Sequence, residues 1–157
     1  MIILASKSPR RKELLSLITD DFTVDSSEVD ETLPSGIEPD KAVEYLSKIK
    51  AQPFRKSGKI VIGADTVVAI DGKILGKPKN EKDAFLMLKN LSGKEHSVFT
   101  GVTVIKNDKE VTFSVQTKVK FFELDDREIE DYISSGEPFD KAGAYGIQGK
   151  GSLFVEK

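Results

Sequence analysis

Residues 6–12 read Ser-Lys-Ser-Pro-Arg-Arg-Lys, a cluster of hydroxyl and cationic side chains that could bind an anion. Ser8 and Pro9 are residue types favoured at the N-cap and the first position of a helix. The cations that follow fall in the first helical turn, where free N–H groups and the helix dipole favour negative charge. The run therefore predicts a phosphate site, in which arginine can bind bidentately, and the alternative is a solvated basic turn.

Asp65 interrupts the most apolar stretch of the chain, residues 59–70. A carboxylate within a central strand needs a partner or a chemical role, because an unpaired buried charge is costly. It could coordinate a metal, or accept a proton from a metal-bound water. The alternative is an aspartate at the end of a turn that bonds to nearby backbone N–H groups.

Residues 135–151 combine repeated glycines with two acids, two lysines, a tyrosine and a glutamine, and they offer little to bury. Glycine lets a backbone approach a ligand closely, and polar side chains of a loop can converge on that ligand. A merely flexible loop is the alternative, although such loops are usually rich in Ser and Asn and lack an aromatic residue. None of the three stretches is a Walker motif or has the Rossmann glycine spacing.

Composition restricts the kind of metal site that this chain could build. The sequence has no cysteine and a single histidine, which excludes disulfides, thiol catalysis, zinc–thiolate sites and multi-histidine sites. Any metal must therefore be held by carboxylates and by the ligand itself. Such oxygen ligands favour Mg²⁺ or Mn²⁺.

Length and charge exclude several classes of protein. The 157 residues, 38% hydrophobic and 32% charged, are typical of one soluble globular domain. A net charge of −2 gives no basic footprint for nucleic acid, and 8% aromatic residues offer no evident platform for stacking bases. No apolar run is long enough to cross a membrane, and no basic region precedes the first apolar residues as in a signal peptide. We therefore expect a cytoplasmic protein that binds neither nucleic acid nor membrane.

Hydrophobic periodicity and turn residues predict an α/β fold with a mixed, largely antiparallel twisted sheet flanked by helices. The first helix should bury Leu14, Leu15, Leu17 and Ile18, and the second should bury Ala42, Tyr45, Leu46 and Ile49. Expected strands are 2–6, 22–25, 59–70, 73–75, 96–106, 110–122 and 153–155. The first expected helix begins at 8–9, and three further helices are expected at 40–51, 81–91 and 125–134.

Five motifs together resemble the Maf family. They are Leu-Ala-Ser-Lys-Ser-Pro-Arg-Arg at 4–11, Gly-Ala-Asp-Thr-Val-Val at 63–68, Gly-Lys-Pro at 76–78, Thr-Gly-Val at 100–102 and Asp-Lys-Ala-Gly-Ala-Tyr-Gly-Ile-Gln-Gly at 140–149. They occur in family order and spacing. The resemblance implies two lobes around a central cleft, a shape related to house-cleaning inosine triphosphatases, and often a homodimer.

The resemblance also implies a role for individual residues. It makes Asp65 the catalytic carboxylate that activates water and helps to hold the metal, and it makes Glu31 the acid that supports that metal. Asp30 or Glu28 could substitute for Glu31. The residues that would bind the triphosphate are Ser6, Arg10, Arg11, Lys50 and Lys77.

The loop at 140–149 would recognise the base. The resemblance puts Gln148 at the position that reads the base, with Asp140, Lys141 and Tyr145 shaping the same wall. The string Ala-Tyr-Gly-Ile-Gln is similar to the family branch that acts on the pyrimidine nucleotides dTTP and UTP. A second branch, which acts on a methylated guanine nucleotide, carries a different string.

The implied activity is hydrolysis of a nucleoside triphosphate to the monophosphate and pyrophosphate, which would cleanse nucleotide pools. The alternative is a regulator of cell division and septum formation that binds nucleotide without significant turnover. Such a regulator would need the basic residues and the base-reading loop, but not an aspartate poised at a water. We expect residues 1–157 to form a single Maf-like domain. Family members usually continue past the last strand, so the chain is either truncated or naturally short.

Overall fold

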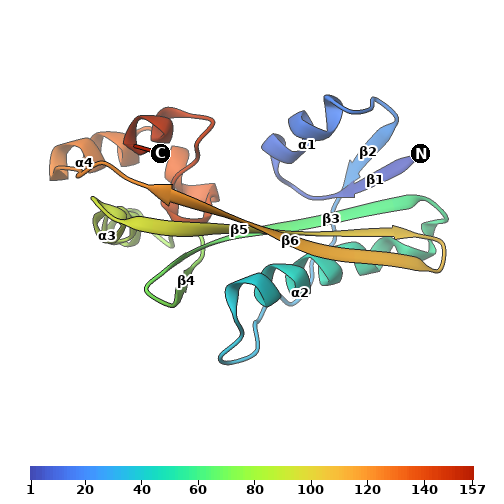
Figure 1. Ribbon diagram of the computed structural model, residues 1–157. Coiled ribbons are helices and arrows are strands. Elements are labelled where there is room, and N and C mark those ends of the chain that lie inside the picture. The colour runs from blue at the N-terminus through green and yellow to red at the C-terminus, as the bar shows by residue number, and fades with distance from the viewer. The chain divides into compact units, whose positions relative to one another are not determined.

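A mixed six-stranded sheet is the framework of the computed structural model, which describes all of residues 1–157 (Figure 1). Strand β1 pairs in parallel with β2 and with β3, whereas β3 and β4 form an antiparallel hairpin. The order is β2-β1-β3-β5-β6, with β4 on β3. The expected mixed sheet flanked by helices is confirmed. The strands are β1 (Ile2–Ala5), β2 (Phe22–Asp25), β3 (Ile60–Ile70), β4 (Lys73–Leu75), β5 (Glu95–Lys106) and β6 (Lys109–Lys120).

Three of the four α-helices begin at a residue whose side chain caps the helix. Ser8 and Asn80 accept a hydrogen bond from a backbone N–H three residues on, and Asp125 forms a capping box with Glu128. No helix is long and apolar enough to span a membrane. The helices are α1 (Pro9–Ser16), α2 (Pro39–Ala51), α3 (Glu81–Leu91) and α4 (Asp126–Ser134), with 3-10 helices η1 (Gln52–Ser57), η2 (Glu137–Asp140), η3 (Ala142–Ala144) and η4 (Lys150–Phe154).

The residues group into two compact units. The first unit comprises Met1–Asp65 and Thr100–Val115, and the second comprises Thr66–Phe99 and Gln116–Lys157. Each unit is therefore assembled from two separate parts of the chain.

In the first unit, α2 lies against β3 and β5 at a distance that only glycine permits. A Cβ on Gly63 would lie 2.4 Å from the carbonyl oxygen of Ser47, and one on Gly101 would lie 2.2 Å from that of Val43. The Ser47 hydroxyl is 2.7 Å from that of Thr103, which buries a polar pair in this tight interface. Arg55 and Lys48 form ion pairs with Glu110 at the start of β6.

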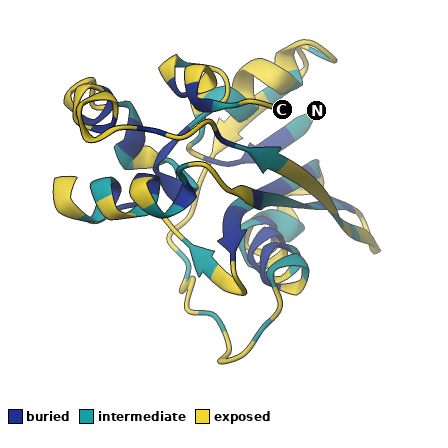
Figure 2. Cartoon of the chain, turned by 60° about the vertical axis from the view of Figure 1, so that its left-hand side comes forward, coloured by how far each residue is buried: buried dark blue, intermediate teal, exposed yellow.

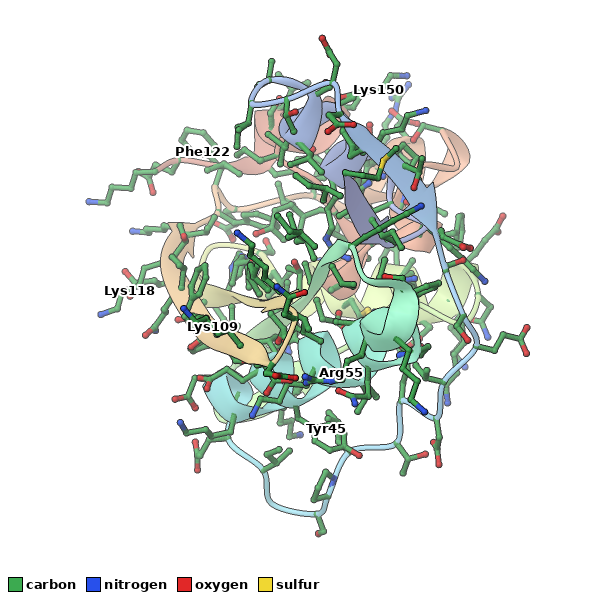
Figure 3. The ribbon with its side chains drawn as sticks, turned by 90° about the vertical axis from the view of Figure 1, so that its right-hand side faces the viewer. Tyr45, Arg55, Lys109, Lys118, Phe122 and Lys150 are labelled. Atoms are coloured by element: carbon green, nitrogen blue, oxygen red, sulfur yellow. The ribbon has the colours of Figure 1, made fainter.

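The buried face of α2 differs from the predicted one. Ala42 and Leu46 are buried as expected, but Tyr45 is 38% exposed and projects from the outer side of the helix (Figure 3). Val43 and Ser47 are buried instead. The close approach to β3 and β5 turns the small side chains of α2 inwards, and this removes the space that a tyrosine would need.

The prediction that α1 buries an apolar face is also wrong. This helix buries none of its residues, and Leu17 and Ile18, which follow it, are 82% and 83% exposed. Leu14 is exposed as well. The helix is held at its N-terminus, where the Ser8 side chain accepts a bond from the Arg11 backbone, and not by an apolar stripe.

The second unit has its own core between α3, α4 and the strands (Figure 2). Leu88, Leu91, Ile129 and Phe121 are almost completely buried there. His96, the only histidine of the chain, lies in the same core, with its ring edge-on to that of Phe121 at 4.9 Å. Its Nδ1 atom is buried without a hydrogen-bond partner, and burial lowers the pKa of His96 to about 4.

The predicted last strand at 153–155 is replaced by η4 and a single β-bridge between Phe121 and Val155. At the start of η4 the Glu137 carboxylate accepts the N–H groups of Lys150 and Gly151. The segment at 136–151, expected as a plain loop, likewise contains η2 and η3.

The glycine contact under α2 can be tested by Gly101→Ala. The added Cβ would collide with the Val43 backbone and push α2 outwards, so we expect a loss of about 1–3 kcal/mol in the free energy of unfolding. Urea unfolding of the two proteins measures it. Gly76→Ala is the matched control, because a Cβ there meets nothing within 4 Å. Equal stability of both variants would contradict the tight contact.

The buried His96 predicts an acid-sensitive core. Its pKa is lowered from the ordinary 6.5 to about 4, so the unfolded chain binds more protons between these pH values. Stability from neutral His96 is therefore fully present above about pH 6.5 and declines by about 3 kcal/mol as the pH falls to about 4. Urea unfolding from pH 7 to pH 4 should give a shallower pH slope for His96→Gln than for the wild type. Identical slopes would show that His96 is not buried neutral.

Candidate active site

The turn between β1 and α1 brings a serine and an arginine together in the first unit. Ser6 is buried, and its hydroxyl accepts hydrogen bonds from the Ser8 backbone at 3.1 Å and from Arg11 Nη1 at 3.4 Å. Arg11 Nη1 also donates to the Ala64 carbonyl on β3 at 3.1 Å. These bonds hold the guanidinium beside the first turn of α1, whose N–H groups can bind an anion.

Burial lowers the pKa of Arg11, and the charge of Arg10 lowers it further, whereas the Asp65 carboxylate raises it. The guanidinium nevertheless stays charged, because its ordinary pKa lies so far above neutrality. A charged arginine at a helix N-terminus is suited to an oxyanion such as phosphate.

Lys50 lies between two carboxylates of the first unit. Its Nζ is 2.8 Å from Asp65 Oδ2 and 2.9 Å from Glu31 Oε1. The Asp65 side chain is 13% exposed and that of Glu31 is 54% exposed, so the cluster runs from the middle of β3 towards solvent. The predicted partner for Asp65 therefore exists, and it is a lysine from α2.

The position of Lys50 follows from the packing of α2. Ser47 and Ala51 face Gly63, two residues before Asp65, and Lys50 is on the same side of the helix as Ser47. Because Gly63 has no side chain, the helix lies close enough for the Lys50 amine to bond directly to Asp65.

Asp65 and Glu31 are also a pair that could hold a metal ion. No group of three or more Asp, Glu or His side chains is gathered in the structure. Two carboxylates are still sufficient for Mg²⁺, which usually takes one or two of them and completes its shell with water and substrate phosphates. Both already contact one cationic nitrogen, that of Lys50.

The remaining predicted residues lie in the second unit. Asp140 and Gln148 are exposed, and Lys141 donates to Asp140 Oδ1 at 2.9 Å and to the Glu137 carbonyl at 2.8 Å. Lys77 is exposed in the segment after β4. The carbonyl of its neighbour Gly76 accepts a bond from the Gly143 backbone at 3.1 Å, which ties this segment to the glycine-rich loop.

Tyr145 is a core residue of this loop. It is buried, and its hydroxyl lies 2.6 Å from His96 Nε2. Burial raises its pKa well above the ordinary value, so the phenol stays neutral. Tyr145 can therefore shape the loop from within, and its hydroxyl is directed to the histidine.

Sequence reasoning missed three residues that organise this loop, His96, Tyr132 and Glu137. The Tyr132 hydroxyl accepts a bond from the Gly146 backbone at 3.3 Å, and the Glu137 carboxylate accepts two backbone N–H groups. Glu137 could have been identified from the sequence as an acidic residue in a glycine-rich loop. No local signal distinguishes His96 or Tyr132, since their contacts join distant parts of the chain.

Comparison with known proteins identifies the family of this chain. The family model for Maf-like protein matches residues 1–157. A protein of Bacillus pumilus named dTTP/UTP pyrophosphatase is 51% identical over 99% of this chain and 84% of its own length. Proteins of the same name from Bacillus cereus and Thermosipho africanus are 53% and 54% identical over 99% of this chain and 82% and 81% of their lengths.

Solved structures support the fold. The Ham1 protein of Staphylococcus aureus superimposes with a TM-score of 0.56 at 16% identity, over 76% of this chain and 71% of its own. A HAM1 protein from Coxiella burnetii gives 0.52 at 12% identity, over 76% and 72%. At such low identity these structures establish the architecture alone. The full-length match to the family model, together with relatives more than half identical, establishes that this chain belongs to the Maf-like protein family.

Proposed function

We propose that this chain is a nucleoside triphosphate pyrophosphatase that converts dTTP and UTP to the monophosphate and pyrophosphate. The observation that carries the proposal is the ion-paired cluster of Lys50, Asp65 and Glu31, in the same unit as the arginine-bearing helix N-terminus. Relatives named dTTP/UTP pyrophosphatase, at 51–54% identity over nearly the whole chain, support the same reaction and the same bases.

Arg11 and the first turn of α1 would bind the triphosphate, with Ser6 and Arg10 at the same turn. Hydrolysis places additional negative charge on the pyrophosphate that leaves. Cationic groups that are already positioned stabilise that charge without reorganising when it develops. Arg11 is positioned in this way by its bonds to Ser6 and to the Ala64 carbonyl. Lys50 and Lys77 would add charge.

Asp65 would orient or deprotonate the water that attacks the α-phosphorus. Its carboxylate is mostly buried and is fixed by Lys50 at 2.8 Å, so it is held in one position. Attack at the α-phosphorus breaks the bond to the β-phosphate and releases pyrophosphate in one step. Positioning and electrostatics supply most of the catalysis in such phosphate transfers.

The metal would be Mg²⁺ or Mn²⁺, held by Asp65 and Glu31. When bound, it would neutralise phosphate charge and lower the pKa of a coordinated water. Lys50 contacts both carboxylates, so metal binding would require it to give up part of this contact. Its long side chain could then reach a phosphate oxygen.

Gln148 would read the base, because an exposed amide offers both donors and an acceptor to a pyrimidine edge. Asp140, Lys141 and Tyr145 would shape the same loop.

We also propose a homodimeric, cytoplasmic protein. The exposed apolar side chains beside α1 offer a surface that a second copy could cover.

A pyrophosphate-release assay tests the reaction. The purified protein with Mg²⁺ or Mn²⁺ should release pyrophosphate fastest from dTTP and UTP among the common nucleoside triphosphates. Asp65→Asn should lower kcat by a factor on the order of 10²–10⁴ while dTTP binding is largely kept, because the amide cannot accept the proton. Removal of the metal with a chelator should abolish turnover of the wild type.

Asp108→Asn, in the turn between β5 and β6, is the matched control and should keep full activity. Full turnover by Asp65→Asn would contradict the role of Asp65. A folded wild type that binds triphosphate but releases no pyrophosphate would favour the regulator instead.

Gln148→Ala tests recognition of the base. Loss of a hydrogen bond to the base should lower kcat/KM for dTTP and UTP roughly tenfold or more, while metal affinity is unchanged. Gln116→Ala, an exposed glutamine of the same unit, should leave both quantities unaltered. Equal losses for every base would assign Gln148 to the scaffold.

A further inference from the structure

We propose that Glu137 is a positioning residue for nucleotide selectivity, whose carboxylate closes the 141–149 segment into a ring and holds Gln148 in place. The effect on nucleotide selectivity rests on the proposed function, whereas the hydrogen bonds of Glu137 do not depend on it. The second unit contains the whole ring.

The carboxylate joins positions far apart along the chain. Glu137 Oε1 accepts the Lys150 N–H at 3.0 Å, and Oε2 accepts the Gly151 N–H at 3.2 Å. Each oxygen thus binds one backbone N–H at the start of η4, while Glu137 itself begins η2. The two ends of the intervening loop are thereby tied to each other by one side chain.

The glycine at 149 shows how closely the carboxylate fits. A Cβ on Gly149 would lie 1.9 Å from Glu137 Oε1. The φ angle that precedes η4 at Gly149 is −123°, which other residues adopt freely. Gly149 is therefore required for space and not for its backbone conformation.

Tyr132 couples the carboxylate to the middle of the loop. Its hydroxyl accepts the Gly146 N–H at 3.3 Å, and it also helps to lower the pKa of Glu137. Burial alone would raise the pKa of Glu137, but the bonds from Tyr132 and from the backbone outweigh it and lower that pKa. Glu137 is consequently an ionised acceptor at neutral pH, and bonds to a charged acceptor are stronger than neutral ones.

A second set of contacts fixes the loop before Gln148. The Lys141 amine donates to the Glu137 carbonyl, and the Tyr145 hydroxyl pairs with His96. Fixed points at Gly146 and Lys150 leave only residues 147–149 between them. Ile147 is 57% exposed and Gln148 is exposed, so the ring presents this pair to solvent on a constrained backbone.

The ring is expected to affect nucleotide binding more than the hydrolysis step. A side chain that is already ordered loses less conformational entropy when it meets its ligand, which improves affinity and discrimination. Release of the ring would let Gln148 sample many orientations and would weaken recognition of the pyrimidine edge. Lys50 and Asp65 make none of these bonds, so the catalytic step itself should persist.

The test compares Glu137→Gln with the wild type and with Glu130→Gln, an exposed glutamate on α4. In the nucleotide-free protein, amide hydrogen exchange at Gly146, Lys150 and Gly151 should accelerate roughly tenfold or more in Glu137→Gln only. In kinetics, KM for dTTP and UTP should rise roughly tenfold while kcat changes less than about twofold. The preference for pyrimidine over purine triphosphates should fall, and Glu130→Gln should match the wild type throughout.

Unchanged amide exchange in Glu137→Gln would overturn the proposal, and so would an equal loss of kcat with every nucleotide. If Glu137→Gln does not fold, Gly149→Ala displaces the carboxylate without removing its charge and should give the same shifts. If the wild type releases no pyrophosphate, the proposed function fails. Selectivity is then measured as equilibrium binding of dTTP against dGTP, and an unaltered binding ratio in the variant would overturn the ring's role.

Discussion

The close contact between α2 and the sheet is the constraint on which the first unit depends. Gly63 and Gly101 let the helix backbone rest directly on β3 and β5, where any larger residue would collide with it. The same contact decides which side of α2 is buried and where Lys50 lies. It leaves the Lys50 amine at hydrogen-bond distance from Asp65, so a packing requirement places the charges of the candidate active site.

In the second unit, a short polar segment around Gln148 is exposed to solvent, yet its backbone is held by hydrogen bonds on both sides. The core of this unit is apolar and aromatic, and the buried His96 and Tyr132, together with the partly buried Glu137, direct their bonds at one glycine-rich loop. Two glycines of this loop make room for those groups, since a Cβ on Gly149 would meet the Glu137 carboxylate and one on Gly151 would meet the Tyr132 hydroxyl. Rigidity here comes from buried side chains and ionised acceptors, since the loop has little regular structure of its own.

Helix ends, turns and strands could be predicted well because their signals are local. Ser8 before Pro9 and Asp71-Gly72 between two apolar runs each act within a few residues. Burial could not be predicted as well. Tyr45 and Leu14 have the spacing of a buried face, yet both are exposed, because which face is covered depends on the element that packs against it.

The amino-acid sequence alone determined the family, the elements and the types of residue available for chemistry, since these follow from short motifs and local preferences. It also showed that any metal must be held by oxygen ligands, because it contains no cysteine and one histidine. Only the tertiary structure decided that Lys50 bridges Asp65 and Glu31, that Tyr145 faces His96, and that Glu137 closes a ring. These contacts join residues far apart along the chain, and no local preference encodes a distance between them.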